Sequence, residues 1–258
     1  MKIALVQTFL HWENKEKNLS HFDSILDHCE EAADLFVLPE MFTTGFTMNN
    51  KNLGESVNRG TAEWMVNKAS EKNACITGSF ISTDGENYYN TLLWAYPDGR
   101  FQFYHKRHLF RMAGEHLHYS AGNWKIICEY KGFRFLPLIC YDLRFPIWSR
   151  NQFGTPQEYD VLIYVANWPE VRIDAWKKLL YARAIENLSY AIGVNRIGTD
   201  GTNKTYNGQS MAVDFKGECI ATAEDKDIIK IVDLNKQELV TFREKFPAYL
   251  DADAFELK

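Results

Sequence analysis

Short, uninterrupted apolar runs are the feature that most constrains the fold of this chain. They are "LFVL" at residues 35–38, "FLPLI" at 135–139 and "VLIYVA" at 161–166. Each run is too short for a buried helix, and none alternates with polar residues, which is typical of a strand covered on both faces. The chain is therefore expected to form a sheet with helices packed outside it.

Helical patterns lie between the apolar runs. Apolar residues three or four positions apart predict a first helix from Leu19 to Ala33, with Phe22 and Leu26 on its buried face. A second helix is expected around residues 64–69, and a last one stops before Pro247. The segment 173–190 predicts a long helix with one apolar side, made of Trp176, Leu180 and Ile185.

Turn signals in the middle of the chain indicate hairpins. "TDGEN" at 83–87 and "PDGR" at 97–100 separate strands near residues 75–81, 92–96 and 101–105. Helices and strands thus interleave with antiparallel hairpins, which predicts the α/β or α+β class with a mixed sheet or a pair of sheets. Because no linker interrupts the chain, residues 1–258 are expected to form a single domain.

Charge and hydropathy exclude several classes of function. The net charge is -5, and there is no run of Lys and Arg, so neither nucleic acid nor a membrane surface is an expected partner. The start, "MKIALVQTF", is interrupted by Gln7 and reads as a first strand rather than a signal peptide, and no stretch of about 18 apolar residues follows. We expect a cytoplasmic protein that binds a small molecule.

Cysteine and histidine patterns do not indicate a metal site. The five cysteines are widely spaced without a C-x-x-C pair, which disfavours disulfides and structural zinc and predicts free thiols. The histidines His105, His108, His116 and His118 lie close together, but no acidic or cysteine partner completes a recognised ligand spacing. We expect no metal site in these patterns, with packing or hydrogen bonding as the role of each histidine.

Three predicted strands end at a chemically reactive residue. "LFVLPE" ends at Glu40, "FQFYHK" at Lys106 and "FLPLIC" at Cys140. Taken singly, a buried cysteine or a charged strand end is usually structural. Together they form a complete chemical set, in which Glu40 removes the thiol proton, Cys140 attacks, and Lys106 stabilises negative charge on a carbonyl oxygen.

The segments around these residues resemble the three signature segments of the nitrilase superfamily of carbon-nitrogen hydrolases. They are "VLPEMFTTGF", "YHKRHLF" and "LICYDLRFP". The likeness extends to Pro247 and includes "VANWPEVR" and "ARAIENLSYAIGVNRIGTDG". It is strongest to the omega-amidase branch, which includes bacterial 2-oxoglutaramate amidases.

The resemblance implies a fold, a mechanism and a substrate. The implied fold is a four-layer αββα sandwich assembled as a homodimer or a larger homo-oligomer, and it needs no metal and no cofactor. The implied mechanism passes through a thioester on Cys140, with Glu115 as a further glutamate and the backbone N-H of Tyr141 beside Lys106 at the oxyanion. The implied reaction converts 2-oxoglutaramate or 2-oxosuccinamate to the 2-oxo acid and ammonia.

Other residues near these segments are candidates for the substrate pocket. Phe42, Phe46 and Trp168 are expected to wall it, although ordinary core packing is the alternative for each. Arg111, Arg144 and Arg172 are candidate anchors for a substrate carboxylate, although a surface salt bridge is the commoner fate of an arginine such as Arg144 or Arg172.

Two alternative functions remain open at this point. One is another activity of the superfamily, either a different amidase or an N-carbamoyl amidohydrolase. The other is a catalytically silent nitrilase-like scaffold, which the intact Glu40, Lys106 and Cys140 argue against.

Overall fold

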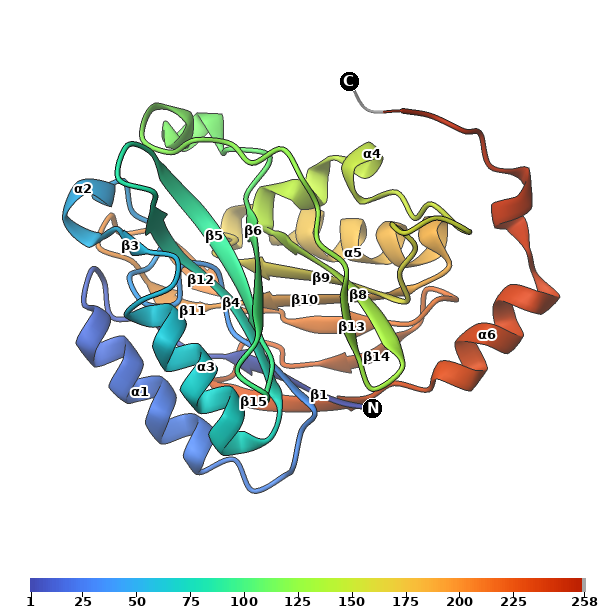
Figure 1. Cartoon of the computed structure of the whole chain (residues 1–258), viewed down its shortest axis with the longest axis horizontal. Coiled ribbons are helices and arrows are strands. Elements are labelled where there is room, and N and C mark those ends of the chain that lie inside the picture. Colours follow the sequence, from blue (N-terminus) through green and yellow to red (C-terminus); the bar gives the residue numbers. More distant parts are fainter. Residues whose placement is uncertain (257–258) are drawn as a thin grey trace.

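Two β-sheets form the centre of the protein, and helices lie on their outer sides (Figure 1). The computed structural model describes residues 1–256 of the 258. Its layers run helix, sheet, sheet, helix, which confirms the predicted four-layer αββα sandwich of the α/β class.

The first sheet contains the N-terminal strand and the middle hairpins. Within the described residues it has seven strands in the order β15-β1-β2-β4-β5-β6, with β3 paired to β4. Their bounds are β1 Lys2–Gln7, β2 Leu35–Val37, β3 Glu55–Ser56, β4 Cys75–Thr83, β5 Tyr88–Ala95, β6 Phe101–His105 and β15 Ile228–Asp233.

The second sheet contains the strand that precedes Cys140. Its order is β14-β13-β10-β9-β8-β7, and a separate hairpin pairs β11 with β12. The bounds are β7 Cys128–Tyr130, β8 Phe133–Ile139, β9 Val161–Ala166, β10 Tyr190–Asn195, β11 Ile197–Thr199, β12 Thr205–Asn207, β13 Met211–Val213 and β14 Cys219–Thr222.

Helices connect these strands and cover the sheets. The α-helices are α1 Lys15–Asp27, α2 Asn50–Leu53, α3 Thr61–Lys72, α4 Pro146–Ser149, α5 Ile173–Asn187 and α6 Lys236–Lys245. Short 3-10 helices are η1 Arg111–Ala113, η2 Glu115–Leu117, η3 Cys140–Arg144, η4 Glu170–Arg172 and η5 Ala248–Asp251.

Alternation along β1 shows how the layers are built. Ile3 and Leu5 face the second sheet and join the core between the sheets, whereas Ala4 and Val6 pack in the core that contains α1 and α3. Successive residues of a strand point to opposite faces, so one fully apolar strand can serve both cores. This explains why the runs predicted to be buried on both faces carry no polar alternation.

Two helix predictions need correction. Helix α1 ends at Asp27 rather than near Ala33, because Asp34 N donates to Lys2 O at 2.8 Å and the chain must return to the sheet before β2. In α5, Trp176 and Leu180 are buried, but Ile185 is exposed. Nine residues after Trp176 is about two and a half turns, which places Ile185 on the opposite side of the helix.

Strand direction brings the ends of several strands to shared edges. In the first sheet β1, β2 and β4 are parallel, and two antiparallel pairings from β4 through β5 return β6 to the same direction. In the second sheet β8, β9 and β10 are parallel. The segments after β2 and β6 therefore leave one edge together, as do those after β8 and β9.

Across residues 1–256, no helix combines the length and apolar character needed to cross a bilayer.

Candidate active site

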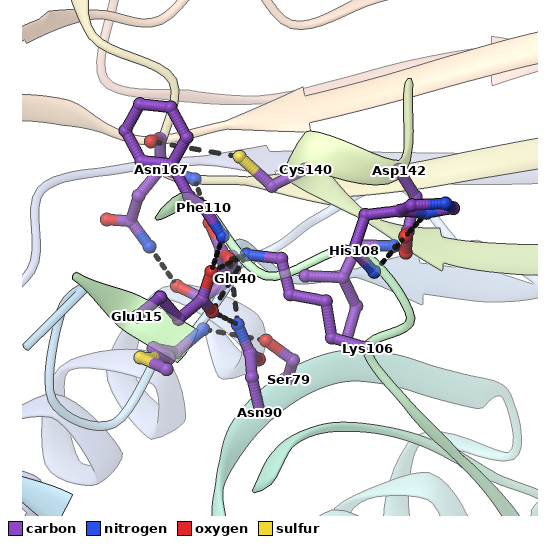
Figure 2. Close-up of polar contacts among 12 residues, drawn as sticks. Glu40, Ser79, Asn90, Lys106, His108, Phe110, Glu115, Cys140, Asp142 and Asn167 are labelled. Atoms are coloured by element: carbon purple, nitrogen blue, oxygen red, sulfur yellow. Dashed lines mark hydrogen bonds and ion pairs between the residues drawn. The ribbon is translucent and has the colours of Figure 1, made fainter. Parts of the chain in front are cut away.

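Glu40, Lys106, Glu115 and Cys140 meet at these strand ends, and we call them the floor of the site (Figure 2). Lys106 directly follows β6, and Cys140 directly follows β8 as the first residue of η3. Glu40 comes three residues after the end of β2, and Glu115 begins η2. The structure thus brings together all four side chains that the sequence and its resemblance predicted.

The ammonium of Lys106 lies between the two carboxylates. Its Nζ donates to Glu40 Oε1 at 2.8 Å and to both carboxylate oxygens of Glu115 at 3.0 Å. All three side chains are fully buried. A buried charge is tolerated only with close partners, so this cluster is held as a unit.

Burial and ion pairing shift the pKa of Lys106, and likewise that of Glu115, in opposite directions. Burial lowers the pKa of Lys106, but the negative charges of Glu115 and Glu40 outweigh it and raise that pKa above its ordinary value. Burial raises the pKa of Glu115, and the Lys106 charge opposes the shift. Lys106 therefore stays a cation at neutral pH.

Cys140 is poised at the bottom of the pocket as a neutral thiol. Burial and the Glu40 charge raise the pKa of the thiol well above its usual value, which the Lys106 charge only partly offsets. A thiol in this environment reacts as a nucleophile only if a base removes its proton. Cys140 also has a φ of 43°, a conformation that is strained for a side chain with a Cβ.

Asp142 links the segment around Cys140 to the segment around Lys106. Its carboxylate accepts from the backbone N-H of Ile139 at 3.1 Å and of His108 at 3.0 Å, and from the Tyr104 hydroxyl at 2.8 Å. It is fully buried. Because Tyr104 and His108 flank Lys106 in the sequence, Asp142 fixes the distance between the thiol and the ammonium.

Two asparagines that the sequence interpretation missed contact the floor. Asn90, on β5, donates to Glu40 Oε1 at 2.8 Å. Asn167 follows β9, and its backbone N-H donates to Glu40 Oε2 at 2.8 Å. The signal that marked Glu40, Lys106 and Cys140, a polar residue after a buried strand, also marks Asn167 in "VANWPE".

A pocket opens above the floor. Its space, part of which is open to solvent, is about 460 Å³. Phe46 and Trp168 line it as predicted, and so does Tyr141. Additional lining residues come from the segment Phe110–Ala113 and from the β11–β12 hairpin, namely Phe110, Ala113, Lys204 and Tyr206.

The prediction that Phe42 walls the pocket is wrong. Its side chain is fully buried on the helix side of the first sheet, where its ring lies 5.2 Å from that of Phe22 and 5.7 Å from that of Trp64. The cause is the turn after Pro39, where Met41 has a φ of 43° and Phe42 N donates to Ser79 O at 2.9 Å. This turn directs Phe42 into the core.

Three cationic side chains, Arg144, Arg172 and Lys204, border the pocket, and we call them the rim. The guanidinium carbon of Arg144 lies 5.0 Å from the ring centre of Trp168, and that of Arg172 lies 5.3 Å from the ring centre of Phe110. Stacking holds a guanidinium while leaving its N-H donors available. Arg111, the third arginine considered from the sequence, is not among the lining residues.

Two of the four histidines considered as metal ligands, His105 and His108, have separate hydrogen-bonding roles. The Nδ1 of His105 lies 2.8 Å from Thr91 Oγ1, and that of His108 lies 2.8 Å from Asp142 Oδ1. Over residues 1–256, no group of three His, Cys, Asp or Glu side chains is arranged to hold a metal ion.

Comparison with protein families and curated proteins gives matches along the whole chain. The carbon-nitrogen hydrolase family model matches residues 2–244. Omega-amidase YafV of Escherichia coli K12 is 46% identical over 258 residues, covering 100% of this chain and 98% of that protein. The 2-oxoglutaramate amidase of Bacillus subtilis is 32% identical over 252 residues, covering 96% of each.

Solved structures agree with the fold. A CN-hydrolase superfamily protein of Xanthomonas campestris, described with an arsenic adduct in its active site, has a TM-score of 0.96 at 39% identity. That match covers 100% of this chain and 99% of the other. Nit3 of Saccharomyces cerevisiae, a nitrilase-superfamily member, has a TM-score of 0.85 at 23% identity, covering 96% and 94%, and supports the fold alone.

Proposed function

Because this chain belongs to the carbon-nitrogen hydrolase family, we propose that it is an omega-amidase acting on short 2-oxo dicarboxylate monoamides. Its substrates are 2-oxoglutaramate and 2-oxosuccinamate, which it hydrolyses to the 2-oxo acid and ammonia. The observation that carries the proposal is the arrangement of the pocket, with a buried Glu40, Lys106 and Cys140 triad at the floor and unpaired cations at the rim.

Acylation begins with transfer of the thiol proton to Glu40. The S-H bond of Cys140 breaks, a proton binds the Glu40 carboxylate, and the sulfur electron pair attacks the amide carbon. The carbonyl π electrons move to its oxygen. When the tetrahedral intermediate collapses, the C-N bond breaks, the nitrogen takes the proton from Glu40, and ammonia leaves a thioester on Cys140.

Deacylation repeats these proton transfers with water. Glu40 removes a proton from a water molecule as its oxygen attacks the thioester carbon, and Glu115 orients that water. Collapse of the second intermediate breaks the C-S bond and releases the acid. The proton held by Glu40 returns to the sulfur, so the enzyme ends as it began.

Negative charge on the carbonyl oxygen requires donors that are already in place. Lys106 supplies one, and the backbone N-H of Tyr141, the second residue of η3, supplies the other. In a buried site such donors stabilise the developing charge more strongly than water does, because they need no reorganisation. The two carboxylates that hold Lys106 also keep it charged and in place.

The rim supplies positive charge for binding the carboxylate end of the substrate. Among residues 1–256, Arg144, Arg172 and Lys204 form no ion pair with a carboxylate of the protein. Unpaired cations beside an apolar pocket attract an anionic ligand, and the planar guanidinium matches a carboxylate in two parallel hydrogen bonds. We propose that Arg144 and Arg172 bind the substrate carboxylate, with Lys204 contributing charge.

We also propose a single-domain, cytoplasmic homodimer that uses no metal or cofactor. All five cysteines are free thiols, which suits a reducing compartment. The side chains of Ile147, Val171 and Ile185 are each at least half exposed, which suits association with a second copy. Light scattering coupled to gel filtration measures the subunit number, and a monomer at micromolar concentration contradicts this part of the proposal.

A substrate panel tests the proposed function. We expect kcat/KM for 2-oxoglutaramate to exceed that for an aliphatic nitrile and for N-carbamoylputrescine, with ammonia release as the assay. Preference for either of the last two compounds would exclude the omega-amidase assignment but leave the Glu-Lys-Cys chemistry standing. Absence of turnover with every amide would favour the silent scaffold.

A further inference from the structure

Asn90 is a buried side chain of the first sheet that contacts both carboxylates of the floor (Figure 2). It is fully buried, and its Nδ2 lies 2.8 Å from Glu40 Oε1 and 3.4 Å from Glu115 Oε1. We infer that Asn90 is a positioning residue that determines which oxygen of Glu40 receives the thiol proton. The inference rests on the amidase mechanism proposed above.

Counting hydrogen bonds on the Glu40 carboxylate identifies that oxygen. Each carboxylate oxygen accepts about two hydrogen bonds. Oε1 already accepts two, from Lys106 Nζ and from Asn90 Nδ2, both at 2.8 Å. Oε2 accepts one, from the backbone N-H of Asn167 at 2.8 Å. The free lone pair is therefore on Oε2.

The thiol lies next to Asn167, the residue whose backbone N-H holds Oε2. Cys140 Sγ is 3.9 Å from Asn167 O, and the N-H of the same residue holds Oε2. Turning the S-H from Asn167 O toward Oε2 allows the transfer: the S-H bond breaks, an O-H bond forms at Oε2, and the electron pair stays on sulfur. Because Asn90 and Lys106 already donate to Oε1, the thiol proton goes to Oε2.

The surroundings of Asn90 indicate that the site uses the N-H donors of this side chain rather than its size and shape. Among residues 1–256, its Oδ1 has no hydrogen-bond partner. A buried oxygen without a donor costs stability, which an apolar residue of similar size would avoid. The side chain instead places two N-H groups at the carboxylates, where donation favours their charged form.

Glu40 is surrounded by several ionisable groups, none of which an Asn90 substitution removes. They are Lys106 after β6, Glu115 in η2, Cys140 in η3, and the more distant phenols of Tyr119 and Tyr206. The acid limb of activity therefore belongs to this cluster of carboxylates as a whole. Loss of the Asn90 donor is expected to move that limb to higher pH, because the charged carboxylates lose a hydrogen bond.

The first test is the pH dependence of kcat/KM for Asn90→Leu. The acid limb is expected to move upward by about one pH unit, the size of one lost hydrogen bond to a charged group. Asn90→Asp, which keeps the size of the side chain, is expected to move it further by adding a third carboxylate. Asn187→Leu is the matched control, since Asn187 is fully buried in α5 and its side chain bonds Arg183 O and Asn151 N in the second half of the chain.

The second test does not depend on the substrate. Alkylation of Cys140 by iodoacetamide, followed by mass spectrometry of the Cys140 peptide, is expected to show the same shift of its acid limb. Reduced activity or a lower melting temperature with an unchanged limb in both Asn90 variants overturns the inference and makes Asn90 merely structural. If the wild type fails to hydrolyse 2-oxoglutaramate, the proposed function fails, and the alkylation limb still decides the role of Asn90.

Discussion

The floor and the rim of the pocket are built in opposite ways. At the floor, Glu40, Lys106 and Glu115 are fully buried and satisfy one another at 2.8–3.0 Å. At the rim, Arg144 and Lys204 are exposed and Arg172 is half-buried, and two of the three stack on aromatic rings. The floor is therefore a closed set of charges, in which each charge is paired with another. The rim is an open set, because within residues 1–256 its cations have no carboxylate partner.

This difference separates the reaction from the choice of substrate. A closed, preorganised cluster acts on charge that develops during the reaction, so it should govern kcat. Open cations act on charge that the substrate already carries, so they should govern KM. Substitutions in the two regions are expected to give opposite kinetic signatures.

The largest effect is expected at the nucleophile. Cys140→Ala and Cys140→Ser should leave less than about a hundredth of the wild-type turnover, because no group remains to carry the acyl intermediate. Cys29→Ser and Cys219→Ser, at more exposed thiols, are the controls and should retain activity. Activity of Cys140→Ala above that level would rule out covalent catalysis by this residue.

Lys106 comes next. Lys106→Ala should lower kcat by on the order of 10²-fold or more with little change in KM, the usual consequence of losing an oxyanion donor. It also leaves two buried carboxylates without their cation, so unfolding must be measured alongside. Lys68→Met is the control: Lys68 is likewise buried among carboxylates, with Asp23 at 2.9 Å, but lies away from the pocket. Normal kcat with raised KM would make Lys106 a binding residue.

Arg172→Met should show the opposite signature. KM for 2-oxoglutaramate is expected to rise about tenfold, the size of one charge-assisted hydrogen bond, while kcat changes little. A neutral amide should be hydrolysed as by the wild type. Arg111→Met provides the control in the neighbouring segment η1, outside the pocket lining. Equal loss with neutral and anionic amides would show that Arg172 does not select for charge.

The smallest effect is expected at Asp200, which holds the β11–β12 hairpin of the rim. Burial would raise its pKa, but donors from Lys204 N, Thr202 and Tyr206 outweigh burial and lower it. The stabilisation is therefore present above about pH 4 and lost as the pH falls through the lowered pKa.

Asp200→Asn should accordingly reduce the free energy of unfolding by about 1–2 kcal/mol at neutral pH and by much less in acid. Urea unfolding of both proteins at the two pH values measures the difference. An equal difference at both would mean that the charge of Asp200 contributes nothing.

The sequence predicts the floor better than the rim, for a topological reason. Cys140 directly follows a strand whose apolar character is plain, and the parallel strands β8 and β9 end at a common edge of their sheet. Lys106 directly follows the last strand of the predicted hairpins. Glu115 lies in a 3-10 segment without periodicity, so only its resemblance to a family residue indicated it. Lys204 was missed because a short hairpin carries it to the pocket, and nothing in its local pattern indicates that position.

Local turns explain the remaining errors. Phe42 lies two residues after Glu40, yet a left-handed turn at Met41 directs it into the opposite core. Asn90 lies within a strand whose neighbours are largely apolar, and polarity at one strand position does not reveal that a carboxylate faces it. Such placements depend on the meeting of distant segments rather than on local propensity.

In the proposed mechanism Cys140 carries the acyl group, Glu40 transfers the protons, and Lys106 stabilises the negative charge on the carbonyl oxygen. Rapid acid quenching during turnover of 2-oxoglutaramate, followed by mass spectrometry of the Cys140 peptide, tests this most directly. We expect an adduct with the mass of the substrate less ammonia, formed together with the first equivalent of ammonia and absent in Cys140→Ala. Release of that first equivalent while Cys140 stays unmodified at every time point would contradict it.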